Sequence, residues 1–500
     1  MFLSLLVFLS LPLLFLSLLI SLIQRNFDSP NGPPTYPIIG CLISFYKNRR
    51  RLLHWYTELM TLSPTKSIVI SRLGSRRIVV TGNPENVEHI LKTNFANYPK
   101  GAPFTELLGD FLGLGIFNVD GATWSAQRKL ASHEFSTKSL REFVVCTLEE
   151  EVQSHLVPEL ELAARQTKVV DMQDVLRRLA FNAICMVTVG SRLPPGLGAA
   201  FDIAARTSAM RGMEPVQMAW KIKRLLNVGQ EKNLKEAIKL VHSSISAFIQ
   251  KKKEEIQKCS DKEKAANKDL LSRLIIAGHS DEMVRDMVIS FLMAGRDTTS
   301  AALTWLFWLL MGHREVEDEI IREVMSINNG ERPLEFEDLK EMKYLKACLC
   351  ETMRLYPPVV WDSKHAIASD VLPDGTKVRS GDRVTYFPYG MGRMEELWGK
   401  DRLEFRPDRW FEADGSGAAK WVSPYKFPVF QAGPRVCLGK EMAFTQMKYV
   451  VTTVLRRFEL QPVGSDRPAF VPLLTAHMAG GLKVRVQDRT IACGGALGRD

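Results

Sequence analysis

The sequence has few cysteines and none of the paired spacings that mark a disulfide framework or a zinc site. Its 8 cysteines are scattered over 500 residues with no CxxC pair, and its 9 histidines include no HExxH motif. A small secreted domain would carry an even ladder of cysteines, and Cys348-Leu349-Cys350 has the wrong spacing for a zinc knuckle. We therefore expect most of these thiols to be reduced and buried, in a chain that faces the cytosol.

The chain also lacks a basic tail and a Gly/Arg-rich tract. Its formal charge of +10 is moderate for its length and is spread in short runs such as Arg49–Arg51 and Lys251–Lys253. This pattern argues against dedicated nucleic-acid binding. It favours an acidic protein partner or an anionic membrane face, although ordinary solvated surface explains any single run equally well.

Charge is missing altogether from the first 23 residues, MFLSLLVFLSLPLLFLSLLISLI. As a helix this run would extend about 34 Å, enough to cross a hydrocarbon core of about 30 Å. A cleaved signal peptide is the alternative, but a basic start and a small-residue cut site are not evident. Basic residues follow the run, which predicts a cytosolic position for the rest of the chain. We expect a transmembrane anchor at 1–24 and a proline-rich hinge at 25–40.

Beyond the hinge, no internal repeat or second linker is evident, which predicts one globular domain over 41–490 and a short tail at 491–500. Strand-like pieces are short: a hairpin of SIVISRLG and RRIVVTG, and later VLPDGTKV, RVTYFP and LKVRV. Amphipathic segments of helical period dominate, at 84–94, 122–132, 138–165, 171–190, 233–256, 281–312 and 314–327. The expected fold class is mainly α with a minor β lobe.

Residues 286–312 form a nearly uncharged segment with polar residues at its middle. A helix that is apolar all round belongs in a core. Gly295 weakens such a helix, Asp297 needs a partner if it is buried, and Thr298 can bond to the carbonyl one turn earlier. One interpretation is a solvent-facing notch, or a kink with Asp297 in a buried salt bridge. The other is a groove over a cofactor, where a hydroxyl and a carboxylate handle protons.

Glu351 and Arg354 are three residues apart in CLCETMRLYPP and so share one helical face. The flanking residues are apolar, which favours burial of the pair. A buried ion pair needs further partners to offset its desolvation. Arg409 in FRPDRWF is the expected third member.

The segment FQAGPRVCLG, residues 430–439, places Cys437 in a tightly specified loop. A lone cysteine is more often a buried small side chain than a ligand. Here Gly433 and Gly439 permit a tight backbone that aims amide groups at the sulfur, as thiolate ligands require. This setting favours a metal-ligating thiolate.

With these motifs the chain resembles the microsomal cytochrome P-450 family of haem-thiolate monooxygenases, over nearly its whole length. More narrowly it resembles the plant fatty-acid omega-hydroxylase clan, in the branch that contains jasmonoyl-isoleucine 12-hydroxylases. The narrower resemblance is carried by PENVEHILKTNF, FTELLGDFLGLGIFN, ASHEF, WDSKHA, PYGMGRMEELWGKD and PVFQAGPRVCLGKEMAF. The family signatures are FQAGPRVCLG, AGRDTT (294–299), ETMR (351–354), PDRW (407–410) and WSAQRK (124–129).

The resemblance implies a P-450 fold and a haem b cofactor whose iron is ligated by Cys437. Asp297 and Thr298 would relay protons to dioxygen, with Ala294 and Gly295 leaving room for it. For His365 an ordinary surface histidine is the alternative. The structural triad would be Glu351, Arg354 and Arg409. The haem contacts would be Trp124, Arg128, His365, Phe430, Gly433, Arg435 and Gly439.

The resemblance also implies the partners: an NADPH-dependent reductase, the endoplasmic reticulum membrane and a carboxylated lipid substrate. Arg211 is the candidate for the substrate carboxylate. The expected activity is omega-hydroxylation of jasmonoyl-isoleucine. The alternatives are omega-hydroxylation of free fatty acids, a haem protein without monooxygenase activity, and a membrane scaffold without haem. The expected substrate contacts are Phe104, Leu107, Phe111, Val359, Val360, Leu474 and Met478.

Overall fold

The computed structural model describes residues 14, 32–36, 38–136, 138–194, 196–214, 217–258, 269–330, 332–464 and 468–489. The expected anchor at 1–24, apart from residue 14, the first part of the hinge and the tail at 491–500 lie outside these residues. Within the described part of the chain, no helix has the length and hydropathy needed to cross a membrane.

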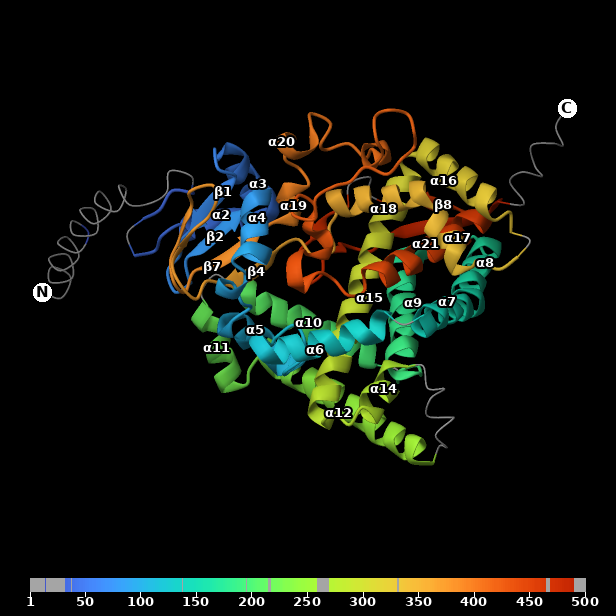
Figure 1. Cartoon of the computed structure of the whole chain (residues 1–500), viewed down its shortest axis with the longest axis horizontal. Helices are drawn as coiled ribbons and strands as arrows, with labels where there is room; N and C mark the ends of the chain where they lie inside the picture. The colour runs from blue at the N-terminus through green and yellow to red at the C-terminus, as the bar shows by residue number, and fades with distance from the viewer. Residues whose placement is uncertain are drawn as a thin grey trace, which may run out of the picture.

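Helices make up most of the molecule and surround one long central helix, α15 (Figure 1). The described helices are α2 (Leu42–Asn48), α3 (Leu52–Leu62), α4 (Pro84–Glu88), α5 (Ala102–Leu112), α6 (Gly121–Ser136), α7 (Lys138–Glu151), α8 (Val157–Arg165), α9 (Met172–Val189), α10 (Leu197–Met213), α11 (Gln217–Leu226), α12 (Gln230–Lys258), α14 (Leu270–Ile276), α15 (Asp281–Met311), α16 (Arg314–Ile327), α17 (Phe336–Glu341), α18 (Lys343–Leu355), α19 (Pro388–Met391), α20 (Glu395–Trp398) and α21 (Lys440–Arg457).

The central helix α15 begins where the sequence supplies a cap and ends at a glycine. The Ser280 side chain accepts a hydrogen bond from the Met283 N–H, and Asp281 and Glu282 place negative charge in the first turn. Both features stabilise a helix N-terminus. Most side chains from Val284 to Leu310 are buried, because neighbouring helices cover α15 on several sides.

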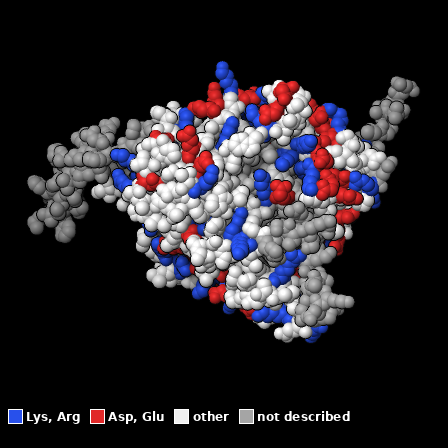
Figure 2. All heavy atoms as spheres, viewed as in Figure 1, with Lys and Arg blue, Asp and Glu red and all other residues white. Residues whose placement is uncertain are grey.

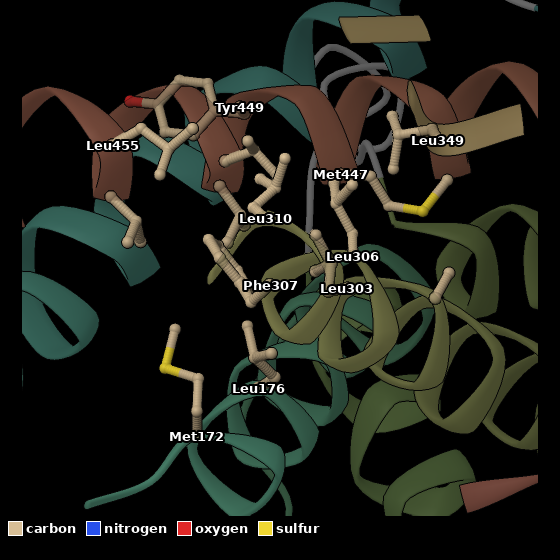
Figure 3. Close-up of a cluster of buried hydrophobic side chains, with 14 of the residues drawn as sticks. Met172, Leu176, Leu303, Leu306, Phe307, Leu310, Leu349, Met447, Tyr449 and Leu455 are labelled. Carbon is tan, nitrogen blue, oxygen red and sulfur yellow. The ribbon is translucent and has the colours of Figure 1, made fainter. Parts of the chain in front are cut away.

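The main hydrophobic cluster joins α15 to α9, α18 and α21 (Figure 3). The side chains that Figure 3 labels come from all four helices and converge on the C-terminal half of α15. This packing fixes α15 along half of its length, while its middle remains open to the cavity described below. The labelled members are Met172, Leu176, Leu303, Leu306, Phe307, Leu310, Leu349, Met447, Tyr449 and Leu455.

The β structure is small and lies mostly at one side of the molecule (Figure 1). One sheet has the order β1-β2-β7-β4, in which the hairpin partners β1 and β2 are antiparallel and β2 runs parallel to β7. Its strands are β1 (Ser67–Ile70), β2 (Ile78–Thr81), β4 (Asp362–His365) and β7 (Arg383–Tyr386). The other strands are β3 (Val169–Asp171), β5 (Asp370–Val371), β6 (Lys377–Val378), β8 (Phe458–Pro462), β9 (Phe470–Val471), β10 (His477–Met478) and β11 (Lys483–Asp488).

The predicted fold class is confirmed, and most predicted helices differ from the observed ones by a few residues. The segment 138–165 is interrupted, because a π-helical turn at Val152–Leu156 separates α7 from α8. Helices α3, α5, α10 and α11 lie outside the predicted ranges. In α10, frequent alanines and glycines give a weak periodic pattern. On the face shown in Figure 2, lysine and arginine side chains are interspersed with acidic ones, which is typical of ordinary solvated surface.

Candidate functional site

A cavity of about 550 Å³ lies between α15, the β1-β2-β7-β4 sheet and the loop that carries Cys437. Helix α5 and the C-terminal part of α10 supply further walls, and the segment 473–475 closes another side. Most of the lining is apolar, with Leu, Phe, Ile, Val and Met side chains from all of these elements. An apolar cavity with a few polar groups is typical of a small-molecule site.

The Cys437 loop places one thiol at the cavity wall, immediately before α21. The Cys437 N–H donates to the Phe430 carbonyl at 2.8 Å, and Phe430 packs on Phe444 with ring centroids 5.2 Å apart. Gly433 has φ +65°, and a Cβ there would lie 2.1 Å from the Leu91 carbonyl oxygen. That position therefore requires glycine for the loop to fold.

The Cys437 side chain has free surface because it faces the cavity. Protein surrounds that cavity, so burial raises the pKa of the thiol. The N–H of Gly439 and the charge of Arg128 oppose this rise. Both groups favour the thiolate, which is the form that ligates metals.

Thr298 and Asp297 are neighbours in α15, but their side chains lie in different environments. The Thr298 hydroxyl donates to the Ala294 carbonyl at 2.7 Å and lines the cavity. Asp297 does not line the cavity, and its carboxylate lies 3.9 Å from the Arg177 guanidinium and 3.7 Å from that of Arg296. Burial raises the Asp297 pKa against the effect of the two arginines. These surroundings of Asp297 match the alternative interpretation of this segment, in which the carboxylate lies in a buried salt bridge.

Gly295 lines the cavity, yet its missing side chain serves helix packing. A Cβ at this position would lie 2.6 Å from the Ile184 side chain on α9. The close approach of α9 and α15 therefore requires glycine there, a reason that the sequence did not reveal. Ala294 also lines the cavity.

Two basic residues of the expected haem contacts lie close to the thiol. Arg435 donates to the Asp120 carboxylate at 2.7 Å and stacks 4.5 Å from the Trp124 ring. Arg128 also lines the cavity and makes no salt bridge within the described chain. Arg128, Arg435 and Trp124 thus form a cationic and aromatic corner beside Cys437.

His365 is not a surface residue, because only 8% of it is exposed. It lies in β4, lines the cavity, and its Nδ1 donates to the Lys100 carbonyl at 2.6 Å. Burial lowers its pKa to about 4, which the bond to Lys100 only partly opposes. The alternative of an ordinary surface histidine is wrong.

The expected triad meets around one buried carboxylate. Glu351 accepts two hydrogen bonds of 2.8 Å from Arg354 and one of 2.7 Å from Arg409. The indole N–H of Trp410 adds another at 3.0 Å. Arg354 also donates to the carbonyl oxygens of three residues between 392 and 404. The cluster therefore joins α18 to the long loop that precedes the Cys437 segment.

Four of the seven expected substrate contacts line the cavity: Phe104, Leu107, Val359 and Leu474. The other three do not. Phe111 is fully buried against Phe201, with ring centroids 5.6 Å apart. Val360 packs in the cluster around α3, on the opposite side of the chain from Val359. The backbone of Met478 in β10 is hydrogen-bonded to the Gln173 side chain, and its own side chain lies in the main core.

The Arg211 hypothesis is wrong. This side chain does not line the cavity. It donates to both carboxylate oxygens of Glu231, at 3.0 and 2.5 Å, and to Asp110 at 3.0 Å. Its donors are thus committed to holding α5, α10 and α12 together.

Sequence reasoning missed the polar groups that the sheet brings to the cavity. Arg72, Lys100, Asp362 and Arg383 line it, from four separate segments. The pairings of β1 with β2, of β2 with β7 and of β7 with β4 bring three of these segments together, and the bond from the His365 N–H to the Pro99 carbonyl adds the segment of Lys100. No local spacing in the sequence signals such a cluster.

These residues fit a haem group. A single thiol, with the Gly439 N–H bonded to it, suits an iron whose other ligands are porphyrin nitrogens. A Cβ at Gly439 would meet a single protein atom, Met442 Cε at 4.0 Å, so a flat group can lie close to the loop. Arg128, Arg435 and the Trp124 N–H are donors of the kind that propionates require.

The comparisons with known proteins agree with this geometry. The sequence profile of the family described as "Cytochrome P450" matches residues 30–479. "Cytochrome P450 94B1" of Arabidopsis thaliana is 60% identical over 92% of this chain and 92% of its own length. "Cytochrome P450 94B3" of the same plant is 58% identical over 94% of each chain.

Among solved structures, the crystal structure of the cytochrome P450DA heme domain matches with a TM-score of 0.76 and 19% identity. The match covers 92% of this chain and 97% of that one, and it shows the fold. The chain belongs to the cytochrome P450 family of haem-thiolate monooxygenases, within its plant CYP94 group.

Proposed function

We propose that this monooxygenase hydroxylates the terminal carbon of a carboxylated lipid, with jasmonoyl-isoleucine as the preferred substrate. One observation supports the substrate class above all. The wall formed by Phe104, Leu107, Val359 and Leu474 is apolar and shares one cavity with Thr298 and Cys437. An acyl chain lies against such a wall with little desolvation cost.

The proposed roles of the chain's residues follow from their positions. Haem, when bound, supplies the activation of dioxygen, with electrons from NADPH that a reductase delivers. Cys437 holds the iron, and Arg128, Trp124, Arg435 and His365 hold the propionates. Phe430 and Gly439 shield the sulfur, while Gly433 shapes the loop.

Thr298 is the proposed proton donor, because its hydroxyl lies in the cavity. Asp297 lies one residue away and reaches Arg177, which is 34% exposed in its side chain and contacts Asp202. Because a guanidinium does not release its proton, a proton from solvent would reach Asp297 through water and the partly exposed Asp202 carboxylate. We assign to Asp297 the resupply of protons to Thr298 through water, because it does not itself line the cavity.

The triad of Glu351, Arg354 and Arg409 has a structural role in this proposal.

We also propose that the apolar run 1–24 anchors the protein in the endoplasmic reticulum membrane, with the catalytic domain in the cytosol. Deletion of residues 1–24, followed by separation of the microsomal and soluble fractions, tests this location. A truncated protein that stays with microsomes through 1 M salt would contradict it.

The experiment for the substrate uses the full chain in microsomes with a plant reductase and NADPH. Jasmonoyl-isoleucine and lauric acid are supplied in parallel, and products are identified by mass spectrometry. We expect both to gain one oxygen at the terminal carbon, with the larger kcat/KM for jasmonoyl-isoleucine. Turnover of lauric acid alone would favour the second candidate function, omega-hydroxylation of free fatty acids, which the same cavity also accommodates.

A further inference from the structure

The cavity wall carries more cations than its carboxylates neutralise. Among the described residues, seven lysines and arginines line it, against the two carboxylates of Glu106 and Asp362. Three of the cations have partners: Lys221 lies 2.5 Å from Glu106, Lys100 2.5 Å from Asp362, and Arg435 2.7 Å from Asp120. Within the described residues, the cavity-lining cations without a carboxylate partner are Arg72, Arg76, Arg128 and Arg383.

These four arginines divide between two ends of the cavity. Arg128 belongs to the Cys437 end, because its charge acts on that thiol and on Arg435. Arg72 and Arg383 belong to the sheet end, because the charges of both act on the Tyr56 phenol. The two propionates of a haem would take Arg128, Arg435 and His365 as partners. His365 pairs in register with Arg383, so the sheet end begins beside the propionate site, and Arg72 and Arg383 remain for another anion.

Arg72 is the most constrained member of this group. It follows β1, is only 8% exposed, and its guanidinium lies 3.8 Å from the Phe45 ring centroid. Its Nε and Nη1 are buried and find no acceptor among the residues that the structure describes. A buried cation with free donors is costly on its own and is stabilised by an anion that accepts from it.

Arg383 approaches the same place from another strand. Its Nε donates to the Ser363 hydroxyl at 2.9 Å, and this bond orients the guanidinium while leaving both Nη groups without an acceptor among the described residues. The charge of Arg72 contributes to lowering the pKa of Arg383, after burial itself. Two arginines therefore converge beside each other, with Arg76 at the exposed rim.

We propose that Arg72 and Arg383 bind the carboxylate of the substrate at the sheet end of the cavity, with Arg76 drawing it toward the rim. This inference rests on the proposed function, since it assigns the acid end of the same lipid. Planar guanidinium groups pair with carboxylates through two parallel hydrogen bonds. With the acid held there, the apolar walls direct the far end of the chain toward Thr298 and Cys437.

The test compares Arg383→Gln and Arg72→Gln with the wild-type full-length protein in microsomes. Binding is followed at the Soret band for lauric acid and its methyl ester, and for jasmonoyl-isoleucine and its methyl ester. We expect each variant to bind the acids about tenfold to a hundredfold more weakly, as loss of charged hydrogen bonds implies. Binding of the esters should change less than threefold, so the preference for acid over ester disappears.

Arg379→Gln is the matched control, because Arg379 is an exposed arginine near β7 that does not line the cavity. The carbon-monoxide difference spectrum of each variant gives the amount of folded, haem-loaded protein, to which all binding is normalised. Where a glutamine variant folds poorly, Arg72→Lys or Arg383→Lys replaces it in the test. These variants retain the charge and should keep part of the preference for acid over ester.

The outcomes separate the two proposals. Unchanged acid preference in both glutamine variants overturns the arginine assignment while the proposed function stands. Loss of haem in proportion to the loss of binding overturns it too, because the arginines would then serve the propionates. A wild-type protein that binds acid and ester equally overturns the carboxylate anchor, and one that oxidises neither acid overturns the proposed function as well.

Discussion

The hydroxyl of Thr298 is one of few hydrogen-bonding groups that α15 presents to the cavity. It donates to the Ala294 carbonyl at 2.7 Å and lines the cavity. We predict that Thr298→Ala lowers product formed per NADPH by about tenfold or more, because a positioned proton donor is lost. NADPH consumption and hydrogen peroxide release measure this uncoupling. Thr298→Ser retains the hydroxyl, and an equal defect in Thr298→Ser would contradict the assignment.

Cys437 differs from the other described cysteines in facing the cavity from a glycine-flanked loop. We predict that Cys437→Ser abolishes the red-shifted peak of reduced, carbon-monoxide-treated protein, because serine does not supply a thiolate to the iron. Circular dichroism checks that the variant is folded. Cys146→Ser, at an exposed position on α7, should keep the full peak. A folded Cys437→Ser protein with that peak would refute the ligand assignment.

Single residues show where sequence reasoning succeeds and where it stops. The Cys437 loop was recognisable because its glycines, arginine and cysteine are contiguous. Val359 and Val360 were not distinguishable, because only the direction of the backbone decides which of them lines the cavity. Arg211 was the candidate for the substrate carboxylate, and its partner Glu231 is identified only once α10 packs on α12.

Helices α9 and α15 cross closely because position 295 has no side chain. A Cβ there would lie 2.6 Å from Ile184. We predict that Gly295→Ala lowers the free energy of unfolding of the haem-loaded protein by about 1–3 kcal/mol, as overpacking does. Denaturant titration measures it.

The control for this prediction is the Ile184→Ala background, where the obstructing side chain is gone. There Gly295→Ala should become neutral or stabilise by up to about 1 kcal/mol, because alanine favours helix. If Gly295→Ala lowers the free energy of unfolding equally in both backgrounds, glycine is required because of the cavity and not because of the contact with Ile184.

Arg211 joins α5 and α10, which line the cavity, to α12. It bonds Glu231 and Asp110 and also donates to the Leu107 carbonyl at 3.0 Å. We predict that Arg211→Gln destabilises the protein by about 3–5 kcal/mol, because a buried carboxylate loses its partner. The preference for acid over methyl ester should persist in the folded fraction. Arg224→Gln removes a partly exposed pair with Asp110 and should cost less than about 1 kcal/mol.

At the scale of elements, local patterns predicted long helices well and the assembly of the cavity poorly. Helix α16 at Arg314–Ile327 matches its predicted bounds, because its apolar residues repeat at the helical period. The cavity's sheet end depends on β2 and β7, which are far apart in sequence and pair in parallel. Such pairings are set by long-range packing, which a single sequence does not encode locally.

For the whole molecule, the stability at mildly acidic pH should depend on His365. Its pKa is lowered to about 4, chiefly by burial, whereas an unfolded histidine titrates near 6.5. Between these pH values the unfolded chain binds a proton that the folded chain does not, so stability falls as pH falls through this window. The difference between these two pKa values corresponds to about 3–4 kcal/mol at most.

We predict that the free energy of unfolding of wild-type protein drops more steeply between pH 6.5 and pH 4.5 than that of His365→Gln. Denaturant titrations at several pH values measure the difference, and His279→Gln serves as the control away from the cavity. A propionate bound at His365 would stabilise the imidazolium and flatten the wild-type curve, so the comparison of haem-loaded and haem-depleted protein reports that contact. Parallel curves for wild type and His365→Gln in both forms would show that the imidazole titrates as it does in the unfolded chain.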